Sequence, residues 1–307
     1  MSRKLLLIMN PCSGQKMGKR HLADILELFC KADYIPTTFM TTGPRNGRQV
    51  AAQHAAAHDL VVCLGGDGTF NEVVCGVLDS GADTPIGYIP CGSTNDFAGS
   101  VGLNKNLLKA AKDILEGSPH TLDVGLFGDR HFTYVASFGA FTRASYATPQ
   151  NTKNLLGHLA YILEGIKDIP SLRAHHLRVE TPEQVFEGDY IFGGICNSTS
   201  VAGILTLDPN IVDMNDGLLE LLLIKMPKNA LELDECIRAL QKQNYTSPML
   251  TLHSTDRMTV YADPAMPWTL DGEREEGHDR IEVRNLHNAI RLIVNGGKKS
   301  KVKEMPH

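Results

Sequence analysis

The sequence predicts an α/β domain built on a mostly parallel sheet, followed by a second domain of antiparallel strands. Two patterns lead to this prediction. Short apolar segments alternate with amphipathic segments across residues 1–126, and after about residue 127 the chain changes to closely spaced strand-like segments. Alternating strands and helices form parallel sheets covered by helices, whereas consecutive strands form antiparallel sheets. With 307 residues, 42% of them hydrophobic, the chain can bury a core in each domain.

The first domain is expected to span residues 1–126, with strands and helices in alternation. The expected strands are Lys4–Met9, Thr37–Thr41, Leu60–Leu64, Ile86–Ile89 and Thr121–Leu126. The helices expected between them are Lys19–Lys31, Asn46–Ala57, Phe70–Leu78 and Lys105–Leu115. Ligands of such sheets bind beyond the carboxyl ends of the parallel strands, so the loops that follow these strands are the first candidates for a site.

The second domain is expected to span residues 127–288, and residues 289–307 are expected to return to the first domain. The expected strands are His131–Ser137, Leu177–Glu180, Tyr190–Cys196, Leu218–Ile224, Leu250–His253 and Met258–Ala262. Two helical segments, Leu155–Lys167 and Leu231–Gln243, are expected to interrupt them. Consecutive strands of this kind indicate an antiparallel sheet.

Composition and charge exclude several classes of function. The formal net charge is −5, whereas a protein that binds duplex nucleic acid needs clustered Lys and Arg, so nucleic acid is not an expected partner. The seven cysteines are scattered and odd in number, which favours reduced thiols in the cytoplasm over a disulfide framework. No apolar segment reaches the roughly 20 residues that span a bilayer, so any contact with a membrane should be peripheral.

The strongest motif is Gly65-Gly66-Asp67-Gly68-Thr69, which lies between a buried-looking strand and a helical segment. Glycines let backbone amides approach an anion closely, and the N-terminus of the following helix favours phosphate through its dipole. Asp67 would repel a phosphate unless a cation lay between them, so it is a candidate magnesium-linked group. The alternative is a tight turn without a ligand. The loop matches neither the dinucleotide-binding fingerprint nor a P-loop.

Two further polar loops follow strands of the same predicted sheet. One consists of Asn10, Pro11, Cys12, Ser13 and Gly14, and the other is Pro90–Ala98, which carries Thr94 and Asp96. They offer hydroxyl groups, amides and a carboxylate. Either loop alone could be a simple turn or a helix cap. Because all three loops follow parallel strands, we expect them to converge on one ligand-binding edge.

Two carboxylates, Asp271 and Glu273, flank a glycine far downstream. Phosphoryl transfer to an alcohol needs a group that takes the hydroxyl proton and cations that offset the charge of the moving group. Asp271 and Glu273 could supply the proton acceptor and a ligand for a cation. The alternative is an acidic turn without chemistry, and the residues alone do not decide between the two.

These motifs, in this order and spacing, resemble those of the diacylglycerol kinase catalytic domain family, in its bacterial branch of soluble diacylglycerol kinases and YegS-like lipid kinases. The resemblance covers nearly the whole chain. It implies an N-terminal α/β domain that binds ATP and a C-terminal antiparallel β-sandwich domain for the lipid. The implied reaction is the transfer of the γ-phosphate of ATP, with Mg²⁺, to a hydroxyl of diacylglycerol or a related lipid.

The resemblance also implies roles for individual residues. Asp67 and Asp96 would support the metal and the phosphates. Glu273 would act as general base, with Asp271 beside it as a second catalytic residue. The residues expected to contact ATP are Asn10, Pro11, Cys12, Ser13, Gly14, Thr41, Gly65, Gly66, Asp67, Gly68, Thr69, Phe70, Asn71 and Thr94.

A structural Mg²⁺ is implied near Asp213, Asp216 and the backbone oxygen of Leu218, where the alternative is an Asp-Gly hairpin turn. Two alternatives to a lipid kinase stay open. NAD kinases, a related family, also use a Gly-Gly-Asp-Gly-Thr loop, and a non-catalytic regulator that responds to a nucleotide or lipid could retain the fold. The lysine-rich segment Lys298–Lys303 is expected to aid peripheral contact with anionic lipid. The sequence leaves a homodimer open.

Overall fold

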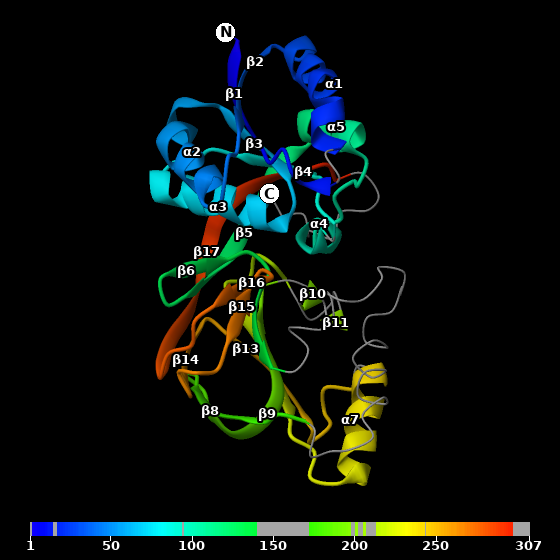
Figure 1. Ribbon diagram of the computed structural model, residues 1–307, viewed down its shortest axis with the longest axis vertical. Coiled ribbons are helices and arrows are strands. Elements are labelled where there is room, and N and C mark those ends of the chain that lie inside the picture. Colours follow the sequence, from blue (N-terminus) through cyan, green and yellow to red (C-terminus); the bar gives the residue numbers. More distant parts are fainter. Residues whose placement is uncertain are drawn as a thin grey trace. The chain divides into compact units, whose positions relative to one another are not determined.

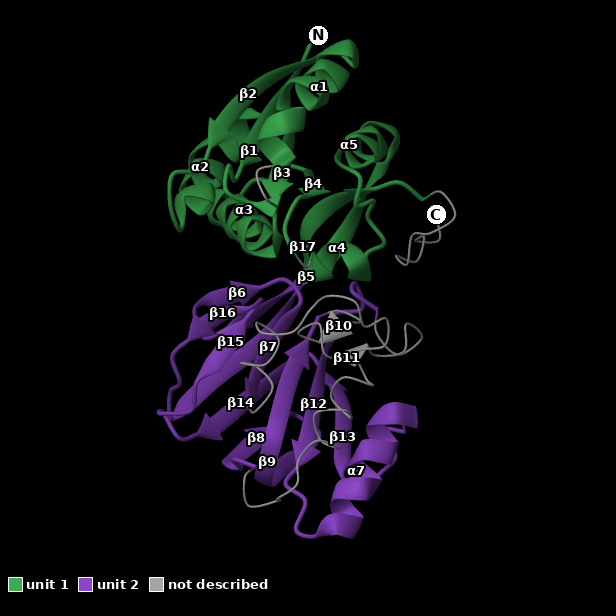
Figure 2. Ribbon diagram, turned by 45° about the vertical axis from the view of Figure 1, so that its right-hand side comes forward, with its two compact units in different colours: residues 1–123, 288–307 green, residues 124–287 purple. Residues whose placement is uncertain are grey.

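The computed structural model describes residues 2–14, 17–93, 95–139, 172–197, 200–201, 205–206, 213–242 and 244–296 (Figure 1). The chain forms two compact units, which are Met1–Asp123 with Asn288–His307, and Val124–His287 (Figure 2). Two strands, β5 (Ser118–Phe127) and β17 (Arg280–Val294), contain the points at which the chain passes from one unit to the other.

Unit 1 is built on a parallel sheet of apolar strands. Its strands are β1 (Arg3–Met9), β2 (Tyr34–Met40), β3 (Leu60–Gly65) and β4 (Ile86–Pro90), in the order β4-β3-β1-β2. The far end of β17 runs parallel to β4, where Leu292 is the register partner of Ile86. All residues of β3 and β4 are buried, as expected for strands covered on both faces.

Helices cover both faces of this sheet. They are α1 (Met17–Lys31), α2 (Asn46–His54), α3 (Asp67–Ser80), α4 (Asp96–Ser100) and α5 (Leu107–Glu116), with a short 3₁₀ turn at Ala55–Ala57. Alternate side chains of β1 and β3 pack against α1 and α5, for example Leu7 and Val62 with Phe29 and Ile114. Helices α2 and α3 pack on each other (Figure 1).

Unit 2 is made of antiparallel strands. Its longer strands are β7 (Val135–Gly139), β8 (His175–Glu180), β9 (Val185–Cys196), β12 (Leu219–Lys225), β13 (Leu250–Thr255) and β14 (Arg257–Ala262). The shorter ones are β6 (Arg130–Phe132), β10 (Ser200–Val201), β11 (Leu205–Thr206), β15 (Trp268–Leu270) and β16 (Glu273–Glu275). The large sheet follows the order β16-β15-β7-β9-β8-β14-β17, with β12 between β9 and β13 and with β6 beside β5. Strands β10 and β11 form a separate two-stranded sheet. Helix α7 (Ala230–Lys242) is the helix described in this unit.

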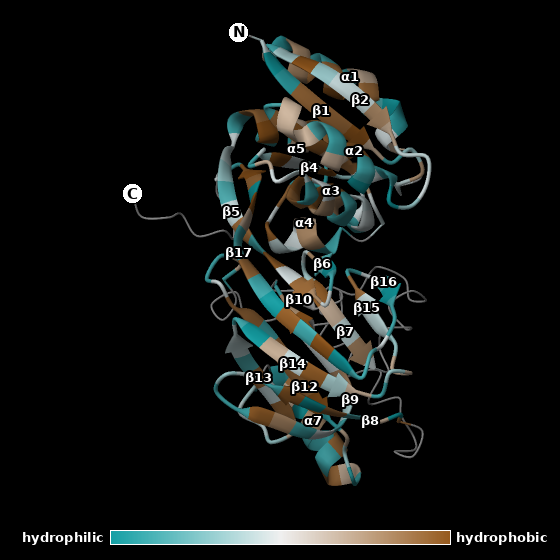
Figure 3. Ribbon diagram, turned by 90° about the vertical axis from the view of Figure 1, so that its left-hand side faces the viewer, coloured by the Kyte–Doolittle hydropathy of each residue, from teal (hydrophilic) through white to brown (hydrophobic). Residues whose placement is uncertain are grey.

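One apolar cluster forms the core of unit 2, and most of its strands contribute alternate side chains to it. In β17, Ile281 and Val283 are buried in this cluster, whereas Arg280, Glu282 and Arg284 are exposed. The alternation is visible as brown and teal bands along the strand (Figure 3). Alternation of this kind fixes which face of each strand is buried, because a shift of one residue would move every apolar side chain to the solvent face.

The parallel α/β part and the antiparallel second part agree with the predicted fold class. Two local differences have consequences for the site. Helix α3 begins at Asp67, three residues before the predicted start, and the predicted strand His131–Ser137 is interrupted at Thr133-Tyr134. The predicted helix Leu155–Lys167 and the lysine-rich segment lie outside the described residues. None of the described helices combines the length and the apolarity needed to cross a bilayer.

Candidate active site

Three loops meet at the carboxyl ends of β1, β3 and β4. Gly14 has a φ of +52°, and a Cβ atom added to it would lie 2.1 Å from the backbone oxygen of Cys91. A Cβ atom on Gly92 would lie 2.7 Å from the Cα atom of Gly66. The loops therefore approach one another so closely that side chains at these glycines would not fit. The three polar loops expected from the sequence are in contact.

Asn10 ties the first loop to the second. Its Nδ2 atom donates to Oγ1 of Thr69 at 3.1 Å, and its backbone amide donates to the oxygen of Leu64 at 3.0 Å. Its Oδ1 atom accepts from the amide of Cys12, and its backbone oxygen accepts from the hydroxyl of Ser13. Asn10 thus uses its backbone and its side chain to hold the Asn10–Gly14 loop, including Pro11, against the start of α3.

The Gly65–Thr69 motif is the N-terminus of α3. Gly66 caps the helix with extended backbone, and the amide of Phe70 donates the first helical hydrogen bond to its oxygen. The amides of the first turn, including those of Gly68 and Thr69, precede that bond and have no partner within the helix itself. Amides at a helix N-terminus form a site for an anion such as a phosphate.

Asp67 and Asp96 lie side by side at this helix terminus. The amide of Asp96 donates to Oδ2 of Asp67 at 2.9 Å, and the hydroxyl of Tyr88 donates to its Oδ1 at 3.4 Å. Burial, together with the negative charge of Asp67, raises the pKa of Asp96 from 3.8 to about 6, and Lys105 opposes that shift. Two adjacent carboxylates that repel each other are stabilised by a divalent cation, and oxygen atoms are the ligands that Mg²⁺ prefers. This pair fits Mg²⁺.

Phe70 belongs to the core beneath the site. Its ring is fully buried and stacks on Tyr88 and Phe97, with ring centroids 4.4 and 4.5 Å apart. The contact of Phe70 with ATP stays a prediction, and the side chain of Phe70 packs in the core. The side chain of Asn71 accepts a hydrogen bond from the thiol of Cys75.

A fourth loop follows β2 and includes Thr41, and Glu72 accepts hydrogen bonds where this loop leads into α2. The amide of Thr41 donates to the oxygen of Met9 at 2.8 Å. The two carboxylate oxygens of Glu72 accept from the amides of Arg45 and Gly47 at 2.7 and 2.9 Å, at the start of α2. Sequence analysis missed Glu72, which acts as a cap for a helix that begins 26 residues earlier in the chain. The expected ATP contact Thr94 lies outside the described residues.

Asp271 and Glu273 lie in a hairpin of unit 2. The hairpin joins β15 to β16 through Asp271 and Gly272, with φ values of +48° and +86°. Two positive φ values in a two-residue loop are the signature of a type I′ turn. Glu273 keeps 60% of its side chain exposed, and its carboxylate lies 3.7 Å from Nη2 of Arg130, which also pairs with Glu275 at 2.7 Å.

Asp271, in contrast, is only 6% exposed. Its carboxylate accepts four hydrogen bonds, from the amide and hydroxyl of Thr133 at 2.6 and 2.7 Å and from the amides of Tyr134 and Val135 at 3.0 Å. Burial raises the pKa of Asp271, and these donors oppose the rise because they stabilise the carboxylate. The prediction that Glu273 is a general base stays a prediction, but the two carboxylates have different surroundings.

The expected structural metal segment forms a turn. Oδ1 of Asp216 accepts from the amide of Leu218 at 2.9 Å, and the oxygen of Leu218 accepts from Nδ2 of Asn285 at 2.9 Å. An Asp side chain that bonds the amide two residues on is an Asx turn, which forms without a metal. Among the described residues, no group of three or more His, Cys, Asp or Glu side chains could hold a metal ion. Metal binding by Asp213, Asp216 and Leu218 stays a prediction.

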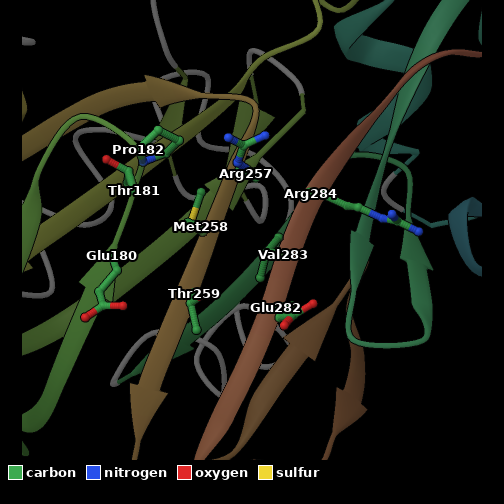
Figure 4. A pocket seen from close by; sticks show the side chains of 9 residues that line it. All are labelled: Glu180, Thr181, Pro182, Arg257, Met258, Thr259, Glu282, Val283 and Arg284. Atoms are coloured by element: carbon green, nitrogen blue, oxygen red, sulfur yellow. The ribbon is translucent and has the colours of Figure 1, made fainter.

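A groove of about 490 Å³ lies along β8, β14 and β17 (Figure 4). It is lined by Glu180, Thr181, Pro182, Arg257, Met258, Thr259, Glu282, Val283 and Arg284. None of the catalytic, ATP-contacting or metal-binding residues predicted from the sequence lines this groove. Arg257 and Arg284 are register partners, yet Arg284 points away from Arg257, so their charges do not converge on a ligand in the groove.

The chain is similar in sequence to known diacylglycerol kinases. The sequence profile of the diacylglycerol kinase catalytic domain matches residues 4–127. The chain is 32% identical over 294 residues to a diacylglycerol kinase of Bacillus subtilis strain 168, across 95% of this chain and 96% of the relative. It is 29% identical over 275 residues to a diacylglycerol kinase of Staphylococcus saprophyticus, across 89% and 90% of the two chains.

Solved structures share the fold. A crystal structure of a diacylglycerol kinase from Bacillus anthracis strain Sterne superposes with a TM-score of 0.73 at 19% identity, across 96% of this chain and 97% of the other. A second structure from the same strain superposes with a TM-score of 0.79 at 21% identity, across 96% of both chains. At these identities, the likeness establishes the fold.

Proposed function

Because the chain belongs to the diacylglycerol kinase family and is a lipid kinase, we propose that it transfers the γ-phosphoryl group of ATP to a hydroxyl of diacylglycerol or a related lipid, with Mg²⁺. The observation that carries this proposal is the pair Asp67 and Asp96 at the N-terminus of α3, beside the Asn10–Gly14 loop. A helix terminus for phosphate and a carboxylate pair for a cation are the two parts that phosphoryl transfer needs in one place.

The nucleotide phosphates would lie against the first-turn amides of α3, beside the Asn10–Gly14 loop, in which the amides of Asn10, Cys12 and Ser13 already donate to protein oxygens. The hydrogen bonds of Asn10 and the close contact between the backbones of Gly66 and Gly92 hold the amides of α3 in place before any ligand binds. Mg²⁺ bound by Asp67 and Asp96 would offset the negative charge that develops on the transferred group. The raised pKa of Asp96 supports this role, because the ionised pair is costly without a cation.

Glu273 would accept the proton of the lipid hydroxyl. Its side chain is mostly exposed, as a base that must reach a substrate proton requires, and Arg130 orients it from one side. The lipid acceptor resides in a bilayer, and none of the described helices could span one, so the enzyme would meet its substrate by peripheral contact.

The test is a transfer assay with a panel of acceptors. Purified protein is incubated with γ-labelled ATP, Mg²⁺ and mixed micelles that carry diacylglycerol, monoacylglycerol, ceramide, sphingosine or phosphatidylglycerol, with NAD in a parallel sample. We expect label in the product of diacylglycerol or one related lipid, and loss of label in the Asp67→Asn variant.

Two outcomes would contradict the proposal. Label in NAD alone would assign the protein to the NAD kinases. ATP binding without label in any acceptor would favour a non-catalytic regulator. Omission of Mg²⁺ with a chelator, followed by its restoration, tests the metal separately from the acceptor.

A further inference from the structure

The two carboxylates of the Asp271-Gly272-Glu273 hairpin differ in what they can do for the reaction. A general base must reach the proton that it removes, at about 2.6–3.2 Å or through one water. Glu273 has an exposed side chain, whereas Asp271 is buried. Only Glu273 can approach a substrate without a rearrangement of the hairpin.

The hydrogen bonds of Asp271 account for all of its acceptor capacity. An ionised carboxylate has about four lone-pair sites, and Asp271 receives four hydrogen bonds from Thr133, Tyr134 and Val135. The two bonds from Thr133 are short, at 2.6 and 2.7 Å, as expected for donors to a charged acceptor. A substrate proton would have to displace one of these protein donors.

The segment that binds Asp271 also carries the cation beside Glu273. Arg130 begins β6, and Thr133-Tyr134 connects β6 to β7, so Arg130 and the donors to Asp271 belong to one short stretch of backbone. The amide of Asp271 donates back to the oxygen of Val135 at 2.9 Å. Asn197 fixes this stretch in turn, because its backbone N–H donates to the backbone oxygen of Tyr134 at 2.9 Å.

We propose that Asp271 is a positioning residue for Glu273. Its carboxylate fastens the Asp271-Gly272 turn to Thr133–Val135, and this attachment fixes where β16 begins and hence where Glu273 lies relative to Arg130. This inference rests on the proposed function, because it assigns the proton transfer to Glu273 alone. It also assigns a role to Thr133, which no sequence motif indicates.

The test compares four variants of the full chain over a series of pH values. Glu273→Gln should lose about 10²- to 10⁴-fold in kcat, as expected for a general base. Asp271→Asn, whose amide group faces N–H donors, should lose about 10- to 100-fold in kcat. Thr133→Val, which removes only the hydroxyl donor, should lose about 3- to 10-fold. Asp263→Asn, at an exposed turn of the same unit that bonds Ala265, is the control and should match the wild type.

Three readouts separate positioning from chemistry and from stability. In Asp271→Asn the acidic limb of the pH profile should keep its midpoint, because the proton acceptor Glu273 is unchanged in this variant, and the KM for ATP should change less than twofold. The losses from Asp271→Asn and Thr133→Val should not multiply in the double variant, because both act through one contact. Thr133→Ser, which restores a hydroxyl, should recover most of the loss of Thr133→Val.

Several results would overturn the proposal. If Asp271→Asn removed the acidic limb, Asp271 would be the base. A thermal midpoint that fell while kcat stayed at the wild-type value would make the contact a stabilising one only. Wild-type kcat in Thr133→Val, with Asp271→Asn inactive, would show that Asp271 does not act through Thr133. If Asp271→Asn fails to fold, the Thr133 variants still decide the question.

Amide hydrogen exchange, measured on the protein without substrate, tests the positioning role independently of activity. Asp271→Asn should lose amide protection at Thr133–Val135 and at Glu273, whereas Asp263→Asn should not. Unchanged protection would overturn the positioning role. A wild-type protein that phosphorylates no lipid would instead contradict the proposed function, and the exchange data would still show whether Asp271 holds the turn.

Discussion

The amide of Asp96 donates a 2.9 Å hydrogen bond to Oδ2 of Asp67, so the first residue of α4 is fastened to the first residue of α3. The bond brings two carboxylates together at a partly buried position, where ionisation of both is unfavourable. Such an arrangement lowers the stability of the protein, and a cation bound between the two carboxylates would offset this cost.

Replacement of Asp96 by Asn should make the protein more stable and less active. The pKa of Asp96 is raised from 3.8 to about 6, so the native state holds this proton more tightly than the unfolded state. Its ionisation therefore lowers the free energy of unfolding as pH rises from about 4 to 6, by up to about 3 kcal/mol at pH 7. Urea unfolding at pH 7 with a chelator should show a gain of this order for D96N, and activity should fall at least about 100-fold. Exposed Asp129→Asn is the control. A loss of stability in D96N would contradict the assigned cause of the pKa shift.

Gly14→Ala should weaken nucleotide binding and destabilise unit 1. The added Cβ would lie 2.1 Å from the oxygen of Cys91 at a φ of +52°, so the loop must move, at a cost of about 1–3 kcal/mol. The matched control is Gly43→Ala, since a Cβ there would meet nothing within 4 Å. Calorimetry measures the ATP affinity of both variants, and chemical denaturation measures their free energy of unfolding. Equal effects of the two substitutions would contradict the close contact between the Gly14 loop and Cys91.

Glu72→Ala should loosen the start of α2. The change removes the acceptor of two amides, those of Arg45 and Gly47, and loss of a helix cap costs about 1–2 kcal/mol. Glu72→Gln keeps one acceptor oxygen, so its free energy of unfolding should lie between those of the wild type and Glu72→Ala. Glu27→Ala removes an exposed pair with Lys31 and should change the stability by less than about 0.5 kcal/mol. Chemical denaturation measures all three, and a rise in the KM for ATP in Glu72→Ala would link the cap to the site.

Alkylation should inactivate the enzyme through Cys12. Cys12 is exposed in the Asn10–Gly14 loop, whereas burial raises the pKa of the Cys236 thiol to about 12 and keeps it unreactive. Iodoacetamide should label Cys12 and Cys30, the two exposed thiols among the described residues, and ATP should protect Cys12. Mass spectrometry locates the label. Cys12→Ser should resist inactivation and Cys30→Ser should not, and the reverse pattern would place the sensitive thiol away from the loop.

Sequence patterns predicted the fold class because hydrophobic periodicity depends on residues close in the chain. The strand at Leu60–Gly65 and the glycine loop after it were both readable in this way. The start of α3 was predicted three residues late, because glycines suggested a loop where Asp67 in fact opens the helix. Local patterns carry no information on the partners of Glu72 or Asp271, which lie 25 to 138 residues away.

The sequence did identify Asp271 and Glu273 as a pair, but it could not separate their surroundings. Both are carboxylates in an acidic stretch, and the difference between them arises from burial and from the donors of Thr133–Val135. The Asp-Gly step was itself a signal for a two-residue hairpin. The turn residues Asp271 and Gly272 and the predicted base Glu273 are therefore consecutive in the chain.

The division of unit 1 between the two ends of the chain constrains how the protein is made. Residues 288–296 supply Ile290, Leu292 and Ile293 to its buried interior, and Leu292 pairs with β4. A ribosome releases these residues only after all of unit 2 has been synthesised, so unit 1 cannot be completed during translation of its first 123 residues. Until then, the β4 edge of the N-terminal sheet stays unpaired. A fragment that ends at residue 127 should therefore depend on chaperones or aggregate.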